Sequence, residues 1–357
     1  MRNEIRPLTG LRGVAALVVA LYHCTLQTTM PVPYTPRFIH HGYLAVDLFF
    51  VLSGFVLALT YGRLFRESVS ARAVAGFLFR RFARIYPAYI AITAFVLLRY
   101  GQPNSRPYDA HDLVANLFLV QAWGFGFRSI LGNAWSVSTE LFAYLAFPWI
   151  ILSVARARVI KPLLLLLAIG GIVSVFRFGA GVTGPLDVTG ENSPFAVMRC
   201  CSGFVLGILA FELTAKDRIM RIISGKMANN IALSAIGTAI ALGPNDLISF
   251  FCFPALVLVL YVDRGWAKAL FDNRPIYYIG MVSYSFYLVY PLAQGYVRPH
   301  VAALSYNLIA LNTLGIGATI MLACLFATIS YYVIECPGRL ALNSALRWRK
   351  APVANPA

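Results

Sequence analysis

The stretch Leu8–Leu26, LTGLRGVAALVVALYHCTL, is long and apolar enough to cross a membrane, yet it contains an arginine and a histidine. A membrane-spanning helix needs about 20 mostly apolar residues, and ionisable side chains inside one are rare and point to function. Arg12 and His23 stand eleven positions apart, which places both on one helix face, roughly 16 Å apart along the axis. The alternative is a terminal arginine that reaches the membrane surface and a histidine that only packs against a neighbour.

The composition of the whole chain agrees with a membrane protein. Of its 357 residues, 59% are hydrophobic and only 12% are charged, whereas soluble domains carry about 25% charged residues. The first apolar run follows Arg6 directly and has no small-residue cleavage site, so we expect a retained helix and not a signal peptide. The net charge is +16, but the basic residues fall in short loops between apolar runs, which predicts membrane orientation and no nucleic-acid partner.

Apolar runs of about 20 residues predict an all-α polytopic membrane protein with about ten transmembrane helices. The expected spans are 8–28, 43–61, 84–100, 135–154, 160–178, 195–213, 228–243, 246–262, 275–296 and 308–334. Most basic residues fall in alternate connections, which predicts that both termini are cytoplasmic. The apolar segment from Asp112 to Trp123 is too short to cross, so we expect an interfacial or re-entrant piece there.

One integral membrane domain is expected over residues 1–340, followed by a partly disordered cytoplasmic tail over residues 341–357. The six cysteines are scattered and lack the paired spacing of a zinc site. We therefore predict no metal and no permanently bound cofactor. Membrane lipids are expected partners, and the sequence does not indicate an oligomeric state.

Five polar residues fall at a similar predicted depth, in the outer half of the membrane. They are His23, Asp47, Glu140, Arg199 and Tyr290. A base, a group that orients it and a cation for developing negative charge are what a buried proton-transfer site requires. The alternative is that the two carboxylates and the arginine are salt-bridge partners that tie helices together.

A second group of charges lies before the third predicted span, in FRRFARIYP. Arg80, Arg81 and Arg84 are expected at the cytoplasmic surface, where Arg12 also emerges. Guanidinium groups bind phosphate in bidentate fashion, so this cluster suits a polyphosphate ligand. The alternative is an anchor that only sets membrane orientation, for which any positive charge is sufficient.

Six motifs in a fixed order cover nearly the whole chain. They are RGVAALVVALYH, GYLAVDLFFVLSGFVL, FRRFARIYP, NAWSVSTE, GMVSYSFYLVYP and SYYVIECPGR. In these motifs the chain resembles the acyltransferase 3 family of integral membrane acyltransferases, which O-acylate lipopolysaccharide, other polysaccharides, nodulation factors and macrolides. The resemblance implies a multi-pass protein of the bacterial cytoplasmic (inner) membrane.

The resemblance also implies a reaction, in which an acyl group, expected to be acetyl, moves from cytoplasmic acyl-CoA as co-substrate to a hydroxyl of a glycan or glycolipid at the outer side. It makes His23 the essential histidine and Arg12 the arginine paired with it. Arg80, Arg81 and Arg84 occupy the segment thought to bind the donor. Tyr290 stands where many members have a histidine, which puts a two-histidine mechanism in doubt.

We expect His23 to act as general base on the acceptor hydroxyl or to carry the acyl group transiently. Glu140 or Asp47 is expected to hold the imidazole. The residues expected to bind the acceptor or stabilise the oxyanion are Trp135, Ser136, Ser138, Arg199 and Tyr290. The competing hypothesis is a transporter or flippase of a glycan or lipid-linked precursor, because many spans with buried charges also occur in secondary transport.

Overall fold

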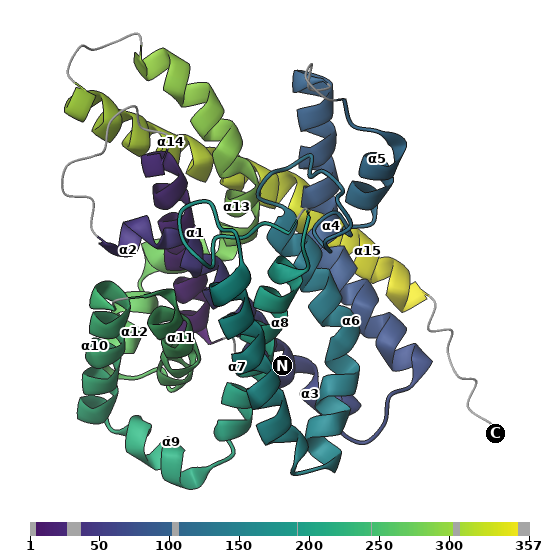
Figure 1. Ribbon diagram of the computed structural model, residues 1–357, viewed down its shortest axis with the longest axis vertical. Helices are drawn as coiled ribbons and strands as arrows, with labels where there is room; N and C mark the ends of the chain where they lie inside the picture. The colour runs from purple at the N-terminus through teal and green to yellow at the C-terminus, as the bar shows by residue number, and fades with distance from the viewer. Residues whose placement is uncertain are drawn as a thin grey trace.

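The structure, a computed structural model, describes residues 5–26, 37–101, 107–190, 192–243, 245–302 and 308–348, and every regular element in these ranges is a helix. The elements are α1 (Arg6–Leu26), α2 (Arg37–His40), η1 (Gly42–Leu44), α3 (Ala45–Phe65), α4 (Ala71–Tyr100), α5 (Ala110–Leu117), α6 (Trp135–Arg156), α7 (Ile160–Phe178), α8 (Phe195–Leu213), α9 (Asp217–Ser224), α10 (Lys226–Leu242), α11 (Asp246–Tyr261), α12 (Gly265–Phe271), α13 (Arg274–Ala302), α14 (Leu308–Ser330), η2 (Tyr331–Glu335) and α15 (Cys336–Trp348). The long helices pack as one bundle (Figure 1).

Several of these helices can cross a membrane, and the chain is a multi-pass membrane protein. Within the described ranges, seven helical runs are long and apolar enough to span, or eight if α11 and α12, which meet at 93°, form one broken span. The predicted number of about ten is therefore not confirmed. The predicted spans 228–243 and 275–296 are helical, as α10 and α13, but neither is among the seven runs that are long and apolar enough to span a membrane.

The third predicted span begins much earlier than residue 84. Helix α4 begins at Ala71, after Ser70, whose side chain accepts a hydrogen bond from the Ala73 N–H, and it continues through Pro87 to Tyr100. The three arginines that were expected in front of the helix therefore lie inside it. The helix tolerates Arg81 and Arg84 because both line an internal cavity.

Two other boundaries bear on the sequence predictions. The predicted end of the domain at residue 340 falls within α15, which continues to Trp348, and residues 349–357 lie outside the described part of the chain. The segment from Asp112 to Trp123 holds the end of the eight-residue α5 and the turns after it. A helix of this length is too short to cross a membrane.

Glycines let the helices that carry the polar residues approach closely. A Cβ added at Gly207 on α8 would lie 2.0 Å from the Val51 carbonyl oxygen on α3, and one at Gly280 on α13 would lie 1.9 Å from the Thr9 oxygen on α1. Small residues allow such backbone contact between membrane helices. These contacts set the positions of α1 and α3, between which the cavity opens.

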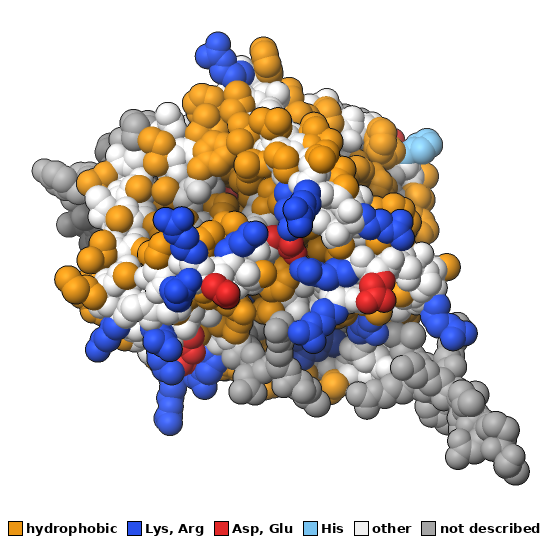
Figure 2. Space-filling view, turned by 90° about the horizontal axis from the view of Figure 1, so that it is seen from below, with side chains coloured by type: hydrophobic (Ala, Val, Ile, Leu, Met, Phe, Trp, Pro, Cys, Tyr) orange, Lys and Arg blue, Asp and Glu red, His pale blue; other side chains and the backbone are white. Residues whose placement is uncertain are grey.

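Basic side chains gather on the lower face of the molecule (Figure 2). The α3–α4 connection, the α6–α7 connection and α9 lie at this end in Figure 1. Exposed basic residues of these segments are Arg66, Arg72, Arg156, Arg158, Lys216, Arg218 and Arg221. That this face is cytoplasmic stays a prediction, based on the excess of basic residues in cytoplasmic loops.

Replacing Gly207 by alanine is expected to destabilise the fold, because the new methyl group would overlap the Val51 carbonyl. Overpacking of this kind costs about 1–3 kcal/mol. We expect the aggregation temperature of the detergent-solubilised variant to be several degrees below that of the parent protein. Size-exclusion chromatography after heating measures it. The matched control is Gly237→Ala on α10, where a Cβ meets nothing within 4 Å. Equal stability of the two variants would contradict this packing.

Candidate active site

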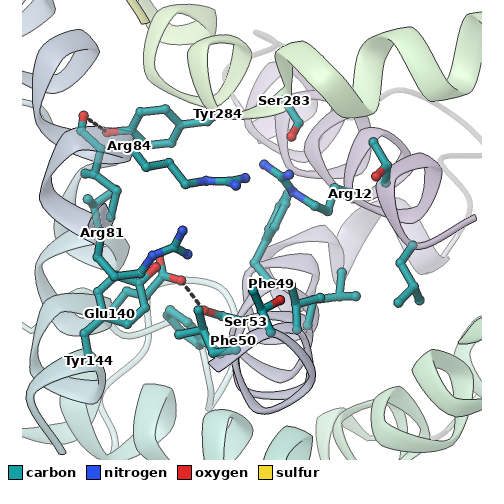
Figure 3. Close-up of a pocket in the computed structure, with 18 of the residues that line it drawn as sticks. Arg12, Phe49, Phe50, Ser53, Arg81, Arg84, Glu140, Tyr144, Ser283 and Tyr284 are labelled. Carbon is teal, nitrogen blue, oxygen red and sulfur yellow. Dashed lines mark hydrogen bonds between the residues drawn. The ribbon is translucent and has the colours of Figure 1, made fainter. Parts of the chain in front are cut away.

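A cavity of about 820 Å³ lies between α1, α3, α4, α6 and α13 (Figure 3). Along α3 its wall runs from Val46 to Arg63, a length of about 25 Å at the rise of an α-helix. Arg63 lies at the end of α3 next to the basic lower face, whereas the opposite end of the cavity is lined by Ser136 and Tyr287. The cavity is therefore long, basic at one end and uncharged but polar at the other.

Four arginines line this cavity: Arg12, Arg63, Arg81 and Arg84. Figure 3 shows Arg12 and Arg84 extending toward each other from opposite walls, with Arg81 entering from the helix that carries Arg84. Among the described residues none of the four forms a salt bridge. Because like charges repel strongly away from bulk water, a polyanionic ligand suits this arrangement.

Three of the four arginines expected to bind the donor, Arg12, Arg81 and Arg84, line this cavity. Arg80 does not line the cavity; its guanidinium lies 5.4 Å from the centre of the Tyr61 ring. Arg81 also lies 5.6 Å from the Tyr61 ring centre, but it leaves the helix about 100° away from Arg80 and lines the cavity. Arg63, which was not among the residues expected to bind the donor, also lines the cavity, and its place on the helix just after the GYLAVDLFFVLSGFVL motif was the available signal.

Glu140 is the carboxylate in the cavity wall. It accepts a hydrogen bond from the Ser53 hydroxyl on α3. Tyr144, one helical turn later, also lines the cavity, and its ring lies 5.8 Å from the Arg81 guanidinium. Glu140 therefore faces the arginine cavity, and the part of the chain that the structure describes shows no contact between Glu140 and His23.

The imidazole of His23 lies outside the lining of the cavity. Its Nδ1 is 2.9 Å from the Val19 carbonyl oxygen and 3.2 Å from the Tyr290 hydroxyl. A carbonyl can only accept, so Nδ1 carries the proton in this arrangement and Nε2 keeps its lone pair. The expectation that Glu140 or Asp47 holds the imidazole differs from the described contacts, in which a backbone carbonyl and Tyr290 hold it.

Asp47 forms a fully buried bidentate pair with Arg199, from α3 to α8. The two nitrogen–oxygen distances are both 2.7 Å. Arg199 also donates to the Tyr43 carbonyl at 2.9 Å, and its guanidinium lies 5.2 Å from the Trp135 ring centre. This arrangement matches the alternative in which buried charges tie helices together. Glu140 takes no part in it, and Asp47, Arg199 and Trp135 do not line the cavity.

The two serines expected near the acceptor are in different places. Ser136 lines the cavity and donates to the Tyr287 hydroxyl at 3.0 Å. Ser138 instead donates to the Leu119 carbonyl at 2.8 Å and accepts from the Ala122 N–H at 3.2 Å. Ser138 thus joins α6 to the preceding loop, and its expected place near the acceptor is not supported. Two positions along a helix rotate a side chain by about 200°, which separates the two serines.

Two tyrosines of α13 stand between the cavity and His23. Tyr287 lines the cavity, and its ring centre is 6.1 Å from that of Tyr290, whose hydroxyl contacts His23. Tyr287 was not singled out in the sequence, although it lies in the same motif as Tyr290. The arginine cavity and the histidine are therefore adjacent compartments along the α1–α13 seam.

The family model described as an acyltransferase domain matches residues 6–333. The chain is similar to the O-acetyltransferase OatA of Staphylococcus aureus (strain NCTC 8325 / PS 47), with 25% identity over 374 residues, 93% of this chain and 57% of OatA. It is also similar to the acyltransferase MdmB of Streptomyces mycarofaciens, with 36% identity over 152 residues, 40% of this chain and 38% of MdmB. The chain spans less than two thirds of the length of the staphylococcal relatives that it matches. No solved structure matches it.

Replacing one partner of the Asp47–Arg199 pair is expected to lower the stability of the protein more than replacing both. Asp47→Leu or Arg199→Met alone leaves a buried charge without its partner, a loss of about 3–5 kcal/mol, whereas the double variant leaves none. We therefore expect the aggregation temperature of the double variant to lie above that of either single variant. Additive losses in the double variant would contradict a direct coupling between the two side chains.

Proposed function

This chain belongs to the acyltransferase 3 family, and we propose that it is a membrane O-acyltransferase of a bacterial inner membrane. In this proposal it moves an acetyl group from cytoplasmic acyl-CoA to a hydroxyl of a glycan or glycolipid at the outer side of the membrane. The names of the relatives, an O-acetyltransferase and an acyltransferase, support the reaction class. Polysaccharide and lipopolysaccharide are the acceptor classes that the family resemblance favours. The geometry supports distinct roles for the arginine cavity and for His23.

The observation that carries the proposal is the set of four cavity arginines, which outnumber the one lining carboxylate, Glu140, and form no salt bridge among the described residues. Arg12, Arg81 and Arg84 converge on one space, and Arg63 lines it from the last turn of α3. Coenzyme A carries several phosphate groups, and guanidinium is the side chain that best matches phosphate oxygens. In this proposal the nucleotide end of the donor enters from the basic face and its phosphates occupy the space between the arginines.

The shape of the cavity suits the rest of the donor. Its length of about 25 Å along α3 accommodates an extended pantetheine arm, and beyond the arginines its wall is largely apolar, with Val46, Phe49 and Phe50 on one side. The arm would point toward Ser136 and Tyr287, at the end nearest His23. We propose that Tyr287 and Tyr290 move apart to admit the thioester to the histidine.

The chemistry assigned to His23 follows from its free nitrogen. Nε2 takes the proton of the acceptor hydroxyl as the hydroxyl oxygen attacks the acyl carbon. The new ester bond then forms while the carbon–sulfur bond of the thioester breaks. The proton passes from Nε2 to the thiolate of coenzyme A, which leaves as the free thiol. Val19 and Tyr290 keep the ring in the tautomer that this step needs. The same nitrogen is also the nucleophile in the variant of the mechanism in which His23 carries the acyl group transiently.

The transporter hypothesis has less support in the fold. Transporters commonly place their substrate at broken helices. The bend of 93° in this chain lies between α11 and α12, and neither helix lines the cavity. Release of free coenzyme A by the purified protein separates the two functions, because a transporter leaves the thioester intact.

Arg84→Met is expected to raise the KM for acetyl-CoA by roughly 10- to 100-fold, because at least one charge-assisted hydrogen bond to the phosphates is lost. The KM for S-acetyl-pantetheine, which lacks the nucleotide phosphates, is expected to stay unchanged. The control is Arg72→Met, an exposed arginine at the start of α4. Coenzyme A release gives both constants. An equal effect on the two donors would place the phosphates elsewhere.

His23→Ala is expected to lower kcat by at least about 100-fold, because the general base is lost. The KM for acetyl-CoA should change little, since the histidine lies outside the arginine cavity. Tyr290→Phe should have a smaller effect on kcat, because the Val19 carbonyl still holds the ring. The control is His111→Ala, on an exposed side chain of α5. Transfer at the parental rate in the His23 variant would refute its catalytic role.

A further inference from the structure

A loop between α7 and α8 is held firmly beside the end of α1 that carries His23; Figure 1 shows it in teal next to the upper end of that helix. Leu186 in this loop is fully buried, and its N–H donates to the Asp246 carboxylate at 3.3 Å. A Cβ added at Gly184 would lie 1.9 Å from the Tyr43 hydroxyl oxygen, so the loop backbone is in direct contact with Tyr43. Tyr43 in turn donates to Asp246 at 2.8 Å. These buried contacts therefore fix the position of the loop.

This loop presents Asp187 next to the histidine. Asp187 Oδ2 accepts hydrogen bonds from the Tyr22 hydroxyl at 2.8 Å and from the Thr183 hydroxyl at 2.9 Å. Tyr22 directly precedes His23, and the two rings meet edge to face with centroids 4.9 Å apart. The Tyr22 side chain thus contacts both the carboxylate of Asp187 and the imidazole of His23.

The second carboxylate oxygen of Asp187 has no role in holding the loop. Oδ1 makes no hydrogen bond or ion pair within the part of the chain that the structure describes, and the side chain is only half-buried. The two hydroxyl groups that position the residue both use Oδ2. An accessible carboxylate oxygen with spare acceptor capacity is well suited to accept from a ligand hydroxyl.

We infer that Asp187 is a specificity-determining residue for the acceptor, whose Oδ1 receives one hydroxyl of an uncharged sugar ring while a neighbouring hydroxyl of that ring faces His23. This inference rests on the proposed function. The nearest charges support an uncharged acceptor: Asp187 forms no ion pair among the described residues, and the nearby Arg199 is committed to Asp47. A carboxylate on the acceptor would meet uncompensated negative charge, which disfavours it.

The experiment uses the purified full chain, acetyl-CoA as donor, and methyl hexopyranosides (gluco, galacto and manno) as acceptors, with methyl glucuronide as the anionic counterpart. Asp187→Asn keeps an oxygen for Tyr22 and Thr183 but replaces the free acceptor oxygen by an amide NH₂. We expect the KM for the best neutral glycoside to rise about tenfold or more. Hydrolysis of acetyl-CoA without acceptor should be unchanged, and the preference for the neutral over the anionic sugar should shrink. The control is Asp217→Asn, on exposed α9 at the opposite end of the molecule.

The outcomes separate the inference from the proposed function. An unchanged acceptor KM and an unchanged neutral-to-anionic preference in the Asp187 variant would overturn the inference while transfer itself persists. So would a parallel loss of hydrolysis, transfer and thermal stability, which indicates a purely structural role. A parent protein that hydrolyses acetyl-CoA but acylates none of the neutral glycosides also overturns it. A parent protein that does not turn over acetyl-CoA at all refutes the proposed function, and the inference with it.

Discussion

The buried pair of Asp47 and Arg199 is the interaction on which the arrangement of the site depends. Neither charge is exposed, and each would be strongly destabilising without the other. The pair joins α3 to α8 where glycine already brings their backbones into contact. It therefore sets the rotation of α3, the helix that supplies one whole wall of the arginine cavity.

Helix α1 carries residues of both the arginine cavity and the histidine site. Arg12 lines the cavity near the basic face, and His23 lies near the opposite end of the same continuous helix. Tyr22 beside it holds Asp187 of the α7–α8 loop. In the proposed function, donor phosphates, acyl transfer and acceptor recognition would have separate positions along this one helix. This order matches a reaction whose two substrates approach from opposite sides of a membrane, as the proposed function requires.

The sequence predictions succeeded where one helix alone decides the answer. The common face of Arg12 and His23 follows from the helical period, and α1 is unbroken between them. They left open how residues on different helices face one another. His23, Asp47 and Glu140 were predicted at one depth, yet they belong to three different environments: the Tyr290 contact, the Arg199 pair and the cavity wall. Depth can be estimated from hydropathy, whereas the direction in which each helix faces cannot.

The sequence by itself determined that the chain lies in a membrane, which polar residues share a helix face, and, through six ordered motifs, the family to which it belongs. The tertiary structure alone decided that Arg81 and not Arg80 enters the cavity, and that Tyr290 and not a carboxylate contacts the histidine. It also brought Asp187, unremarkable in its loop, next to Tyr22. The reason is physical: composition and period are properties of one segment, whereas the pairing of faces depends on close packing between segments distant in the chain.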